Sequence, residues 1–168
     1  VVDRLAPAGT EMPTFVSLPW VICDGTITPG QQASFLGRPH DPLLITRDPN
    51  KPDFKLPELS LPANLSYERL THRRQIQKLI DQQSRLLEHS ASARGLDAYY
   101  EKAMAMLDSP RLREAFNLAA ETEKVRDLYG RTTYGQACLV ARRLIEAGTK
   151  FVTVYFSSSI GGSKGGWD

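Results

Sequence analysis

The chain has 168 residues, of which 41% are hydrophobic and 24% charged, an ordinary composition for one globular domain. Its formal net charge of +2 is too small to predict binding to nucleic acid or to an anionic membrane. The sequence has no signal peptide, and no apolar run approaches the roughly 18 residues of a membrane-spanning helix. Because the chain begins at Val1 without Met and ends in a Gly-rich stretch, we expect residues 1–168 to be an internal fragment of one domain.

The first third of the chain predicts one strand and one long loop. Residues 1–5 are typical of the end of a helix, residues 15–20 of a short strand, and residues 21–32 of irregular structure. The strand has Phe15, Val16 and Leu18 as core candidates, and Pro19 places it at the edge of a sheet or ends it. Residues 33–62 are rich in proline but keep regularly spaced apolar residues. We therefore expect a long ordered loop pinned to the surface by Phe35, Leu43, Leu44, Phe54, Leu56 and Leu59.

A helical section is predicted over residues 66–130. Its first helix has Ser66 as N-cap with Leu65 and Leu70 as a hydrophobic staple, and a second helix spans about residues 96–107. The pair Ser109-Pro110 is typical of an N-cap followed by a proline in the first helical position. A further helix is expected to begin at Thr122 and to end at Gly130.

Residues 133–168 predict a helix, a tight turn, a buried strand and a Gly-rich loop. Thr133 and Gln136 match a capping box, and Gly148 is expected just after the helix. The predicted inner face of this helix is Ala137, Val140, Ala141, Leu144 and Ile145, and the outward side chains are Arg142, Arg143 and Glu146. The run 151–156 is β-branched or aromatic, which favours a strand covered on both faces in a parallel sheet. The chain is therefore predicted to be α/β.

The Gly-rich loop after this strand is the main candidate for chemistry, because ligands of open α/β sheets bind beyond the carboxyl ends of the strands. Its spacing lacks the phosphate-binding pattern Gly-x-x-x-x-Gly-Lys-Ser/Thr, since Lys164 is followed by Gly165. Two interpretations remain: a loop without a ligand, or a loop that positions Trp167 and Asp168 at a site. The Asp168 carboxylate suits a hard cation or Zn²⁺, but it needs further ligands from elsewhere.

Other polar residues have simpler explanations. The spacing of the histidines predicts no shared metal; His72 and His89 are expected in solvent, and His40 in the long loop has a small chance of a functional role. The arginines of residues 69–74 are expected on a solvated helix face, and the serines of residues 157–159 have no His or Asp companion in range. Turn initiation is the expected role of Asp41, Asp48 and Asp53, with a calcium-type site as the alternative. The two cysteines are far apart in sequence and are expected to be buried free thiols, with one disulfide as the alternative: Cys23 and Cys138.

Several phrases along the chain, taken together and in order, resemble a known family. Among them are Phe35-Leu36-Gly37, Asp48-Pro49-Asn50-Lys51-Pro52-Asp53-Phe54, Val125-Arg126-Asp127-Leu128-Tyr129-Gly130-Arg131, Ala141-Arg142-Arg143-Leu144-Ile145-Glu146-Ala147-Gly148 and Gly166-Trp167-Asp168. The set resembles the bacterial family called domain of unknown function 1501, a sulfatase-like branch of the alkaline phosphatase superfamily. The resemblance covers nearly the whole chain.

The resemblance implies a partial doubly wound sheet of an alkaline-phosphatase-like fold, with a helical middle section and divalent metal ions at the carboxyl ends of the strands. It also implies export to the periplasm, because members often carry a twin-arginine signal. The family's Trp-Asp phrase usually continues with Thr-His, so Asp168 is the implied metal ligand, and Lys164 is our candidate for contact with a substrate anion. Family regions that would hold the nucleophile and most ligands have no counterpart here, so the fragment alone is expected to be inactive.

Two functions follow as hypotheses. The first is a fragment of an exported, metal-dependent hydrolase of the sulfatase or phosphatase type, acting on a small anionic ester. The second is a non-catalytic exported binding or assembly protein that retains the fold, with residues 33–107 as its interaction surface. The metal and the oligomeric state stay open.

Overall fold

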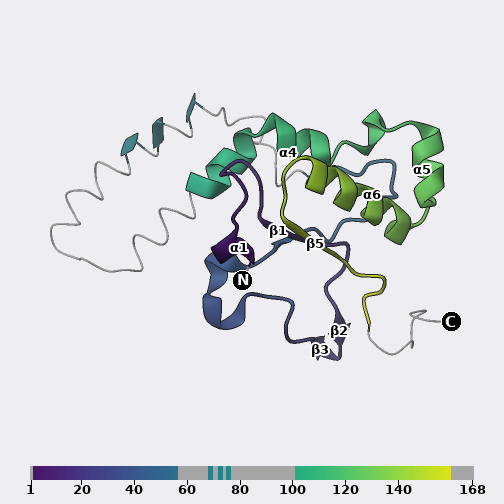
Figure 1. The fold of residues 1–168 in the computed structure, drawn as a ribbon, viewed down its shortest axis with the longest axis horizontal. Coiled ribbons are helices and arrows are strands. Elements are labelled where there is room, and N and C mark those ends of the chain that lie inside the picture. Colours follow the sequence, from purple (N-terminus) through teal and green to yellow (C-terminus); the bar gives the residue numbers. More distant parts are fainter. Residues whose placement is uncertain (1, 57–67, 70–71, 74, 77–100, 160–168) are drawn as a thin grey trace.

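The computed structural model describes residues 2–56, 68–69, 72–73, 75–76 and 101–159 (Figure 1). Its α-helices are α1 (Val2–Leu5), α4 (Pro110–Ala115), α5 (Glu123–Tyr129) and α6 (Thr133–Glu146), and its strands are β1 (Phe15–Leu18), β2 (Cys23–Asp24), β3 (Thr26–Ile27), β4 (Leu43–Leu44) and β5 (Phe151–Val154). Three short 3₁₀ helices are η1 (Ser34–Leu36), η2 (Arg38–His40) and η4 (Leu118–Ala120). The described residues 68–69, 72–73, 75–76 and 101–108 are also helical.

Three of the strands form a small parallel sheet in the order β4–β1–β5. Figure 1 shows β1 and β5 side by side. Phe15 lies opposite Phe151 and Leu18 opposite Val154, so β1 and β5 pair along their whole length. The predicted strand near residues 15–20 is confirmed and ends at Leu18, directly before Pro19. The chain is thus a mixed helix and strand structure with a parallel sheet, which confirms the α/β prediction at that level.

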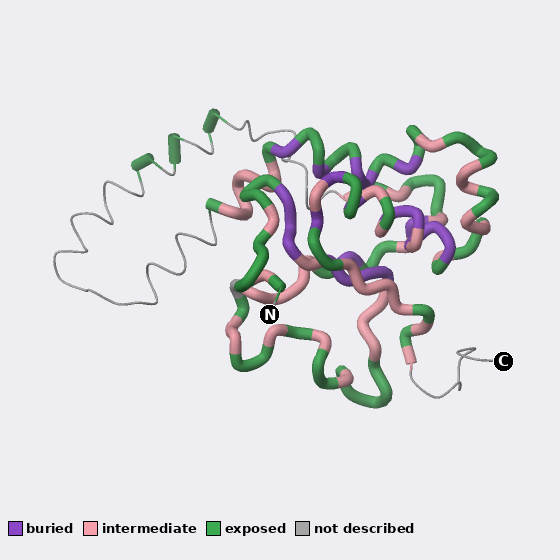
Figure 2. Tube along the Cα trace, in the orientation of Figure 1, coloured by how far each residue is buried: buried purple, intermediate pink, exposed green. Residues whose placement is uncertain are grey.

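The hydrophobic core lies between the sheet and the helices α4 and α6, where Figure 2 shows the buried stretches. Residues of β1 alternate, so Val16 and Leu18 point to one face together. On the β5 strand Val152 and Val154 pack against the same cluster. The loops contribute Met12 and Ile45 to the core. The helical segments contribute the other large buried residues, which are Leu112, Phe116, Leu118, Leu139, Val140 and Leu144.

The helix α6 begins one residue earlier than the sequence predicted. Thr132, not Thr133, is its N-cap, and the Thr132 hydroxyl accepts a hydrogen bond from the backbone N–H of Gly135. The prediction that Thr133 and Gln136 form a capping box is therefore wrong. The Gln136 amide instead donates hydrogen bonds to the carbonyls of Arg126 (2.9 Å) and Gly130 (2.8 Å). A buried amide needs such partners, and these bonds tie the start of α6 to α5.

The end of α6 follows the prediction. Gly148 has a φ of +109°, its N–H bonds to the Ile145 carbonyl, and the Thr149 N–H bonds to the Leu144 carbonyl. This pair of bonds is the Schellman motif, which satisfies the last carbonyls of the helix and requires a residue with positive φ. It turns the chain directly from α6 into β5.

The inner face of α6 is only partly as predicted. Ala137, Val140 and Leu144 are buried, but Ile145 is 50% exposed. The prediction that Arg143 points outward is also wrong: its side chain is only 13% exposed and pairs with Glu121. The reason is that α6 packs against α4 and the segment before α5 as well as against the sheet, so its flank is covered too.

The strand β5 is confirmed, but the prediction that both its faces are covered is wrong. Phe151 is 46% exposed, and the other three residues are half-buried. Within the described residues β5 pairs on one side only, with β1, so it is an edge of this sheet. The face that carries Val152 and Val154 packs on the core, whereas Phe151 and Leu44 are open to solvent.

The long loop predicted over residues 33–62 is described as far as Leu56. It is ordered and contains η1, η2 and β4. Leu43, Phe54 and Leu56 pack against the core as expected, but Phe35 is 92% exposed, and Leu44 is 45% exposed and does not belong to the core cluster. Leu59 lies outside the described residues.

The helical section agrees with the prediction where it is described. Ser109 caps α4 through the Leu112 N–H, and Thr122 caps α5 through the Val125 N–H. Gly130 ends α5 with a φ of +84°. The predicted N-cap Ser66 and its hydrophobic staple lie outside the described residues. No helix in the described ranges is long and apolar enough to cross a membrane.

Candidate functional site

The three parallel strands end at one edge of the sheet, formed by Leu18, Leu44 and Val154, which we call the carboxyl edge. The tight turn at Gly148 reverses the chain, so α6 begins where β5 ends (Figure 1). The rings of Tyr134 on α6 and Phe156 after β5 meet edge to face there, with centroids 5.0 Å apart. Ligands of open parallel sheets bind at this kind of edge, so it is the candidate functional site.

Two segments that leave the carboxyl edge run side by side. The Tyr155 N–H donates to the Leu18 carbonyl at 2.8 Å, which extends the pairing of β1 and β5 by one residue. Further along, the Cys23 N–H donates to the Ser158 carbonyl at 2.9 Å. The serines after β5 are therefore held against the segment after β1, although more than 130 residues separate them in the sequence.

The side chains at this edge are hydroxyls, thiols and a phenol. The Ser157 hydroxyl accepts a hydrogen bond from the Ser159 N–H, while the buried Ser159 hydroxyl has no partner among the described residues. Tyr134 lies beside Cys138, one helical turn further along α6. Negative charge on the neighbouring Cys138 sulfur, a hydrogen bond to it and partial burial raise the pKa of the Tyr134 phenol above its usual value.

The two residues that the sequence singled out, Lys164 and Asp168, lie outside the described residues. The structure describes the chain as far as Ser159, at the carboxyl edge. Whether Lys164 and Asp168 join the edge therefore stays a prediction.

Other residues discussed from the sequence have structural roles. The Asp41 carboxylate accepts from the Ala33 N–H at 2.7 Å, and the Asp48 carboxylate accepts from the Asn50 N–H at 2.9 Å. The turn-forming role predicted for Asp48 is confirmed, because its bond reaches the backbone two residues on, whereas Asp41 bridges the loop to a residue eight positions earlier. Both cysteines are free, but the prediction that they are buried is wrong, because Cys23 is exposed and Cys138 half-buried. Cys23 lies in the small β2–β3 hairpin, which the sequence pattern did not predict.

A polar cluster at the opposite end of the sheet was missed by the sequence. His40 Nδ1 lies 2.7 Å from the Asp3 carboxylate, and Lys102 Nζ lies 3.1 Å from its other oxygen. Burial alone would raise the pKa of Asp3, but hydrogen bonds from Thr14, His40 and Lys102 and the Lys102 charge outweigh it and lower the pKa to about 2. The cluster ties α1 to η2 and to the helical residues 101–108. No spacing in the sequence could reveal it, because its members are up to 99 residues apart.

The described residues do not by themselves fit a divalent metal ion. No group of three His, Cys, Asp or Glu side chains gathers within residues 2–56, 101–159 and the short described stretches between them. Zinc sites have three or four protein ligands, so a zinc site in this protein would need ligands from outside these ranges.

The comparison with protein families identifies the class of the chain. Residues 1–168 match the family described as protein of unknown function, DUF1501, and the chain belongs to this family. The match confirms the resemblance drawn from the sequence at the level of the family. No curated protein and no solved structure matches the chain.

Proposed function

We propose that this chain is a fragment of an exported, metal-dependent hydrolase of sulfuric or phosphoric esters, with a sulfatase-like fold of the alkaline phosphatase superfamily. The observation that supports the proposal is the carboxyl edge. Three parallel strands end there, α6 begins there, and the segment up to Ser159 lies on it. Lys164 and Asp168 follow a few residues later in the sequence.

In this proposal Asp168 supplies one metal ligand, and residues elsewhere in the longer protein supply the others. A divalent metal ion, when bound, polarises an ester oxygen and lowers the pKa of a nucleophile. The Lys164 ammonium offers a point charge with three donors to a sulfate or phosphate group of the substrate. The described residues would act as the scaffold, because β1, β5 and α6 fix the direction in which the chain leaves the sheet.

The test measures bound metal in the full-length protein with and without Asp168→Ala. We expect the variant to lose metal stoichiometry or affinity, because one ligand is removed. Glu11→Ala is the matched control, since Glu11 is an exposed carboxylate that precedes β1 at the other end of the sheet. Equal metal binding by wild type and Asp168→Ala would remove Asp168 from the site.

A second measurement concerns the substrate. Hydrolysis of p-nitrophenyl sulfate and p-nitrophenyl phosphate is followed in the metal-loaded full-length protein, and Lys164→Ala is expected to raise KM while bound metal stays unchanged. An unchanged KM would mean that Lys164 does not contact the substrate anion.

The alternative is a non-catalytic exported protein that retains the fold and binds a partner. The observation that favours it is the segment 49–56, which packs Phe54 and Leu56 against the core and forms one wall of a surface groove. Absence of turnover with both esters in the metal-loaded full-length protein would favour this alternative over the hydrolase.

A further inference from the structure

A groove of about 450 Å³ lies between the segment 49–56, α4 and the region around η4, away from the carboxyl edge. Its volume falls within the range of about 300–1,000 Å³ that ligand-binding clefts occupy. We call it the basic groove and define it by the side chains on which the argument rests: Lys51, Phe54, Lys55, Arg113, Phe116 and Arg126.

The floor of the basic groove is apolar and fixed. Phe116 and Leu118 are buried members of the hydrophobic core, and Phe54 packs against that core from the loop side. A floor that belongs to the core does not collapse or rearrange easily, because interiors are close-packed. An apolar side chain of a partner could therefore be buried there without reorganising the protein.

The walls of the groove are positively charged. Among the described residues, four cations and one carboxylate line it, and this carboxylate, Glu114, already contacts Arg143 and Asn117. Arg113 donates one N–H to the Leu107 carbonyl and Arg126 donates its Nε–H to Gln136, so both guanidinium groups are held in place with other donors left over. The side chains of Lys51 and Lys55 are exposed and contact no carboxylate among the described residues.

We propose that the basic groove binds an acidic peptide segment that carries an apolar side chain. The cations come from three separate parts of the chain, namely the loop 51–55, α4 and α5, so they match several spaced carboxylates better than one anionic group. The apolar floor provides the anchor, and the charged walls provide orientation and selectivity. The proposal is independent of the hydrolase, because none of these residues lies at the carboxyl edge.

The test uses fluorescence anisotropy with a labelled peptide of alternating glutamates around a central phenylalanine. We expect binding that weakens as the salt concentration rises and that weakens about tenfold in the double variant Lys51→Glu/Lys55→Glu. Each single replacement should weaken binding about threefold. Both lysines are exposed, so these variants are expected to fold.

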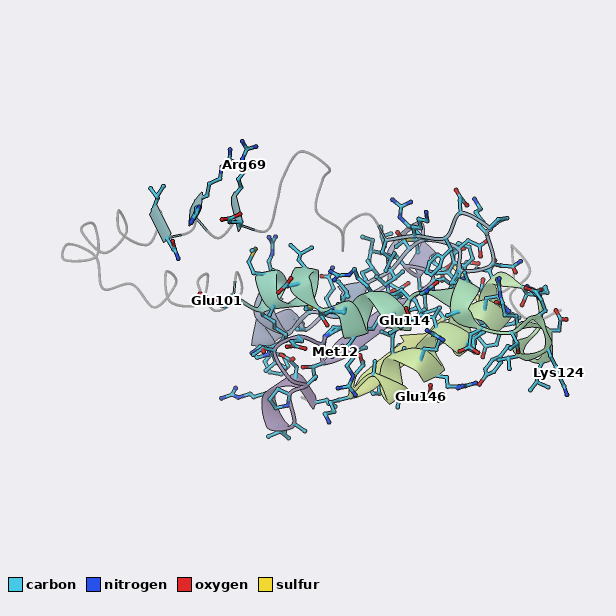
Figure 3. All side chains as sticks on the ribbon, turned by 90° about the horizontal axis from the view of Figure 1, so that it is seen from above. Met12, Arg69, Glu101, Glu114, Lys124 and Glu146 are labelled. Atoms are coloured by element: carbon cyan, nitrogen blue, oxygen red, sulfur yellow. The ribbon has the colours of Figure 1, made fainter. Side chains whose placement is uncertain are left out.

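The control is Lys124→Glu, which reverses one charge, as each single lysine variant of the groove does. Lys124 lies in the first turn of α5, well away from Glu114 in the wall of the groove (Figure 3). It should bind the peptide as wild type does. The same peptide with glutamines in place of glutamates should bind at least tenfold more weakly, as should one with glycine in place of phenylalanine.

Three results would overturn the proposal. The glutamine peptide could bind as tightly as the acidic one, or Lys124→Glu could lower affinity as much as the groove variants do. Displacement of the peptide by an equal concentration of phenyl phosphate would also overturn it, because the groove would then be a site for a small organic anion.

Discussion

Residues 109–154 and residues 21–44 are held in place by different kinds of interaction. In the first region each α-helix begins with a side-chain cap, and apolar residues such as Leu139 and Leu144 are fully buried. In residues 21–44, no residue whose burial is described is buried (Figure 2). Polar side chains such as Gln31 and Asp41 bond the backbone of this region. Loss of a buried side chain weakens a core that the whole region shares, whereas loss of a polar contact at the surface weakens the structure only nearby. Substitutions in the first region should therefore lower the global free energy of unfolding, and those in the second should mainly favour local opening.

The largest expected effect is that of Gly135→Ala in the first turn of α6. A Cβ at this position would overlap the carbonyl oxygens of Tyr129 and Gly130, so the backbone joining α5 and α6 must shift. We expect a loss of about 3 kcal/mol or more in the free energy of unfolding, measured in urea. The control is Gly9→Ala, which has open space around its Cβ and should change stability by less than about 1 kcal/mol. Equal losses would mean that the α5–α6 junction is not tightly constrained.

The next effect tests the core of the same region. Leu144→Ala removes a fully buried side chain, and we expect a loss of about 3 kcal/mol. The neighbouring Ile145→Ala removes a side chain that is half exposed and should cost less than about 1.5 kcal/mol. If Ile145→Ala cost more than Leu144→Ala in thermal or urea unfolding, α6 would not turn Leu144 toward the core.

A smaller effect concerns Asp3, which binds His40 at the end of the second region. The pKa of Asp3 is about 2 in the folded protein against an ordinary value of 3.8, so the folded state binds fewer protons than the unfolded state between these values. The stabilisation, about 2 kcal/mol, is therefore fully present above about pH 4 and is lost as the pH falls through 2.

The measurement is the free energy of unfolding between pH 7 and pH 2 for wild type and Asp3→Asn. The difference between the two proteins should be largest near neutral pH and should shrink as the pH falls. Asp53→Asn, at an exposed position, should follow wild type at every pH. A constant difference between wild type and Asp3→Asn would contradict the lowered pKa.

The smallest global effect is expected for Gln31→Ala. The Gln31 amide bonds both backbone groups of Ile22 and the Thr28 carbonyl, at 2.8 to 2.9 Å. Its removal should speed hydrogen exchange of the Ile22 amide at least tenfold, while the global free energy of unfolding changes by less than about 1 kcal/mol. The adjacent exposed Gln32→Ala should leave the exchange of Ile22 unchanged. A large global loss would show that the two regions unfold as one unit.

The features that the sequence predicted correctly are local. Ser109, Thr122, Gly130 and Gly148 each act on backbone groups within a few residues, so their roles follow from the order of residues alone. The error at the start of α6 arose because two threonines are adjacent, and only the backbone geometry shows that Thr132 is the cap.

The features that the sequence missed depend on partners far along the chain. Arg143 was placed in solvent because its partners lie 22 to 29 residues earlier, on α4 and after η4. The exposure of Phe35 was missed because an apolar residue in a loop does not reveal whether a core lies beside it. For the candidate site, the helix–turn–strand order predicted the carboxyl edge, but not that Ser158 would contact Cys23 or Phe156 would contact Tyr134.

The pairing of β1 with β5 has a consequence for how the protein folds. It joins Phe15 to Phe151 and so closes a loop of about 135 residues, at an entropic cost that grows with the logarithm of loop length. The helices α4 to α6, by contrast, make contacts over short stretches of chain and can form early. We therefore expect the sheet to be assembled late, with a folding rate set by the meeting of two distant strands and not by helix formation.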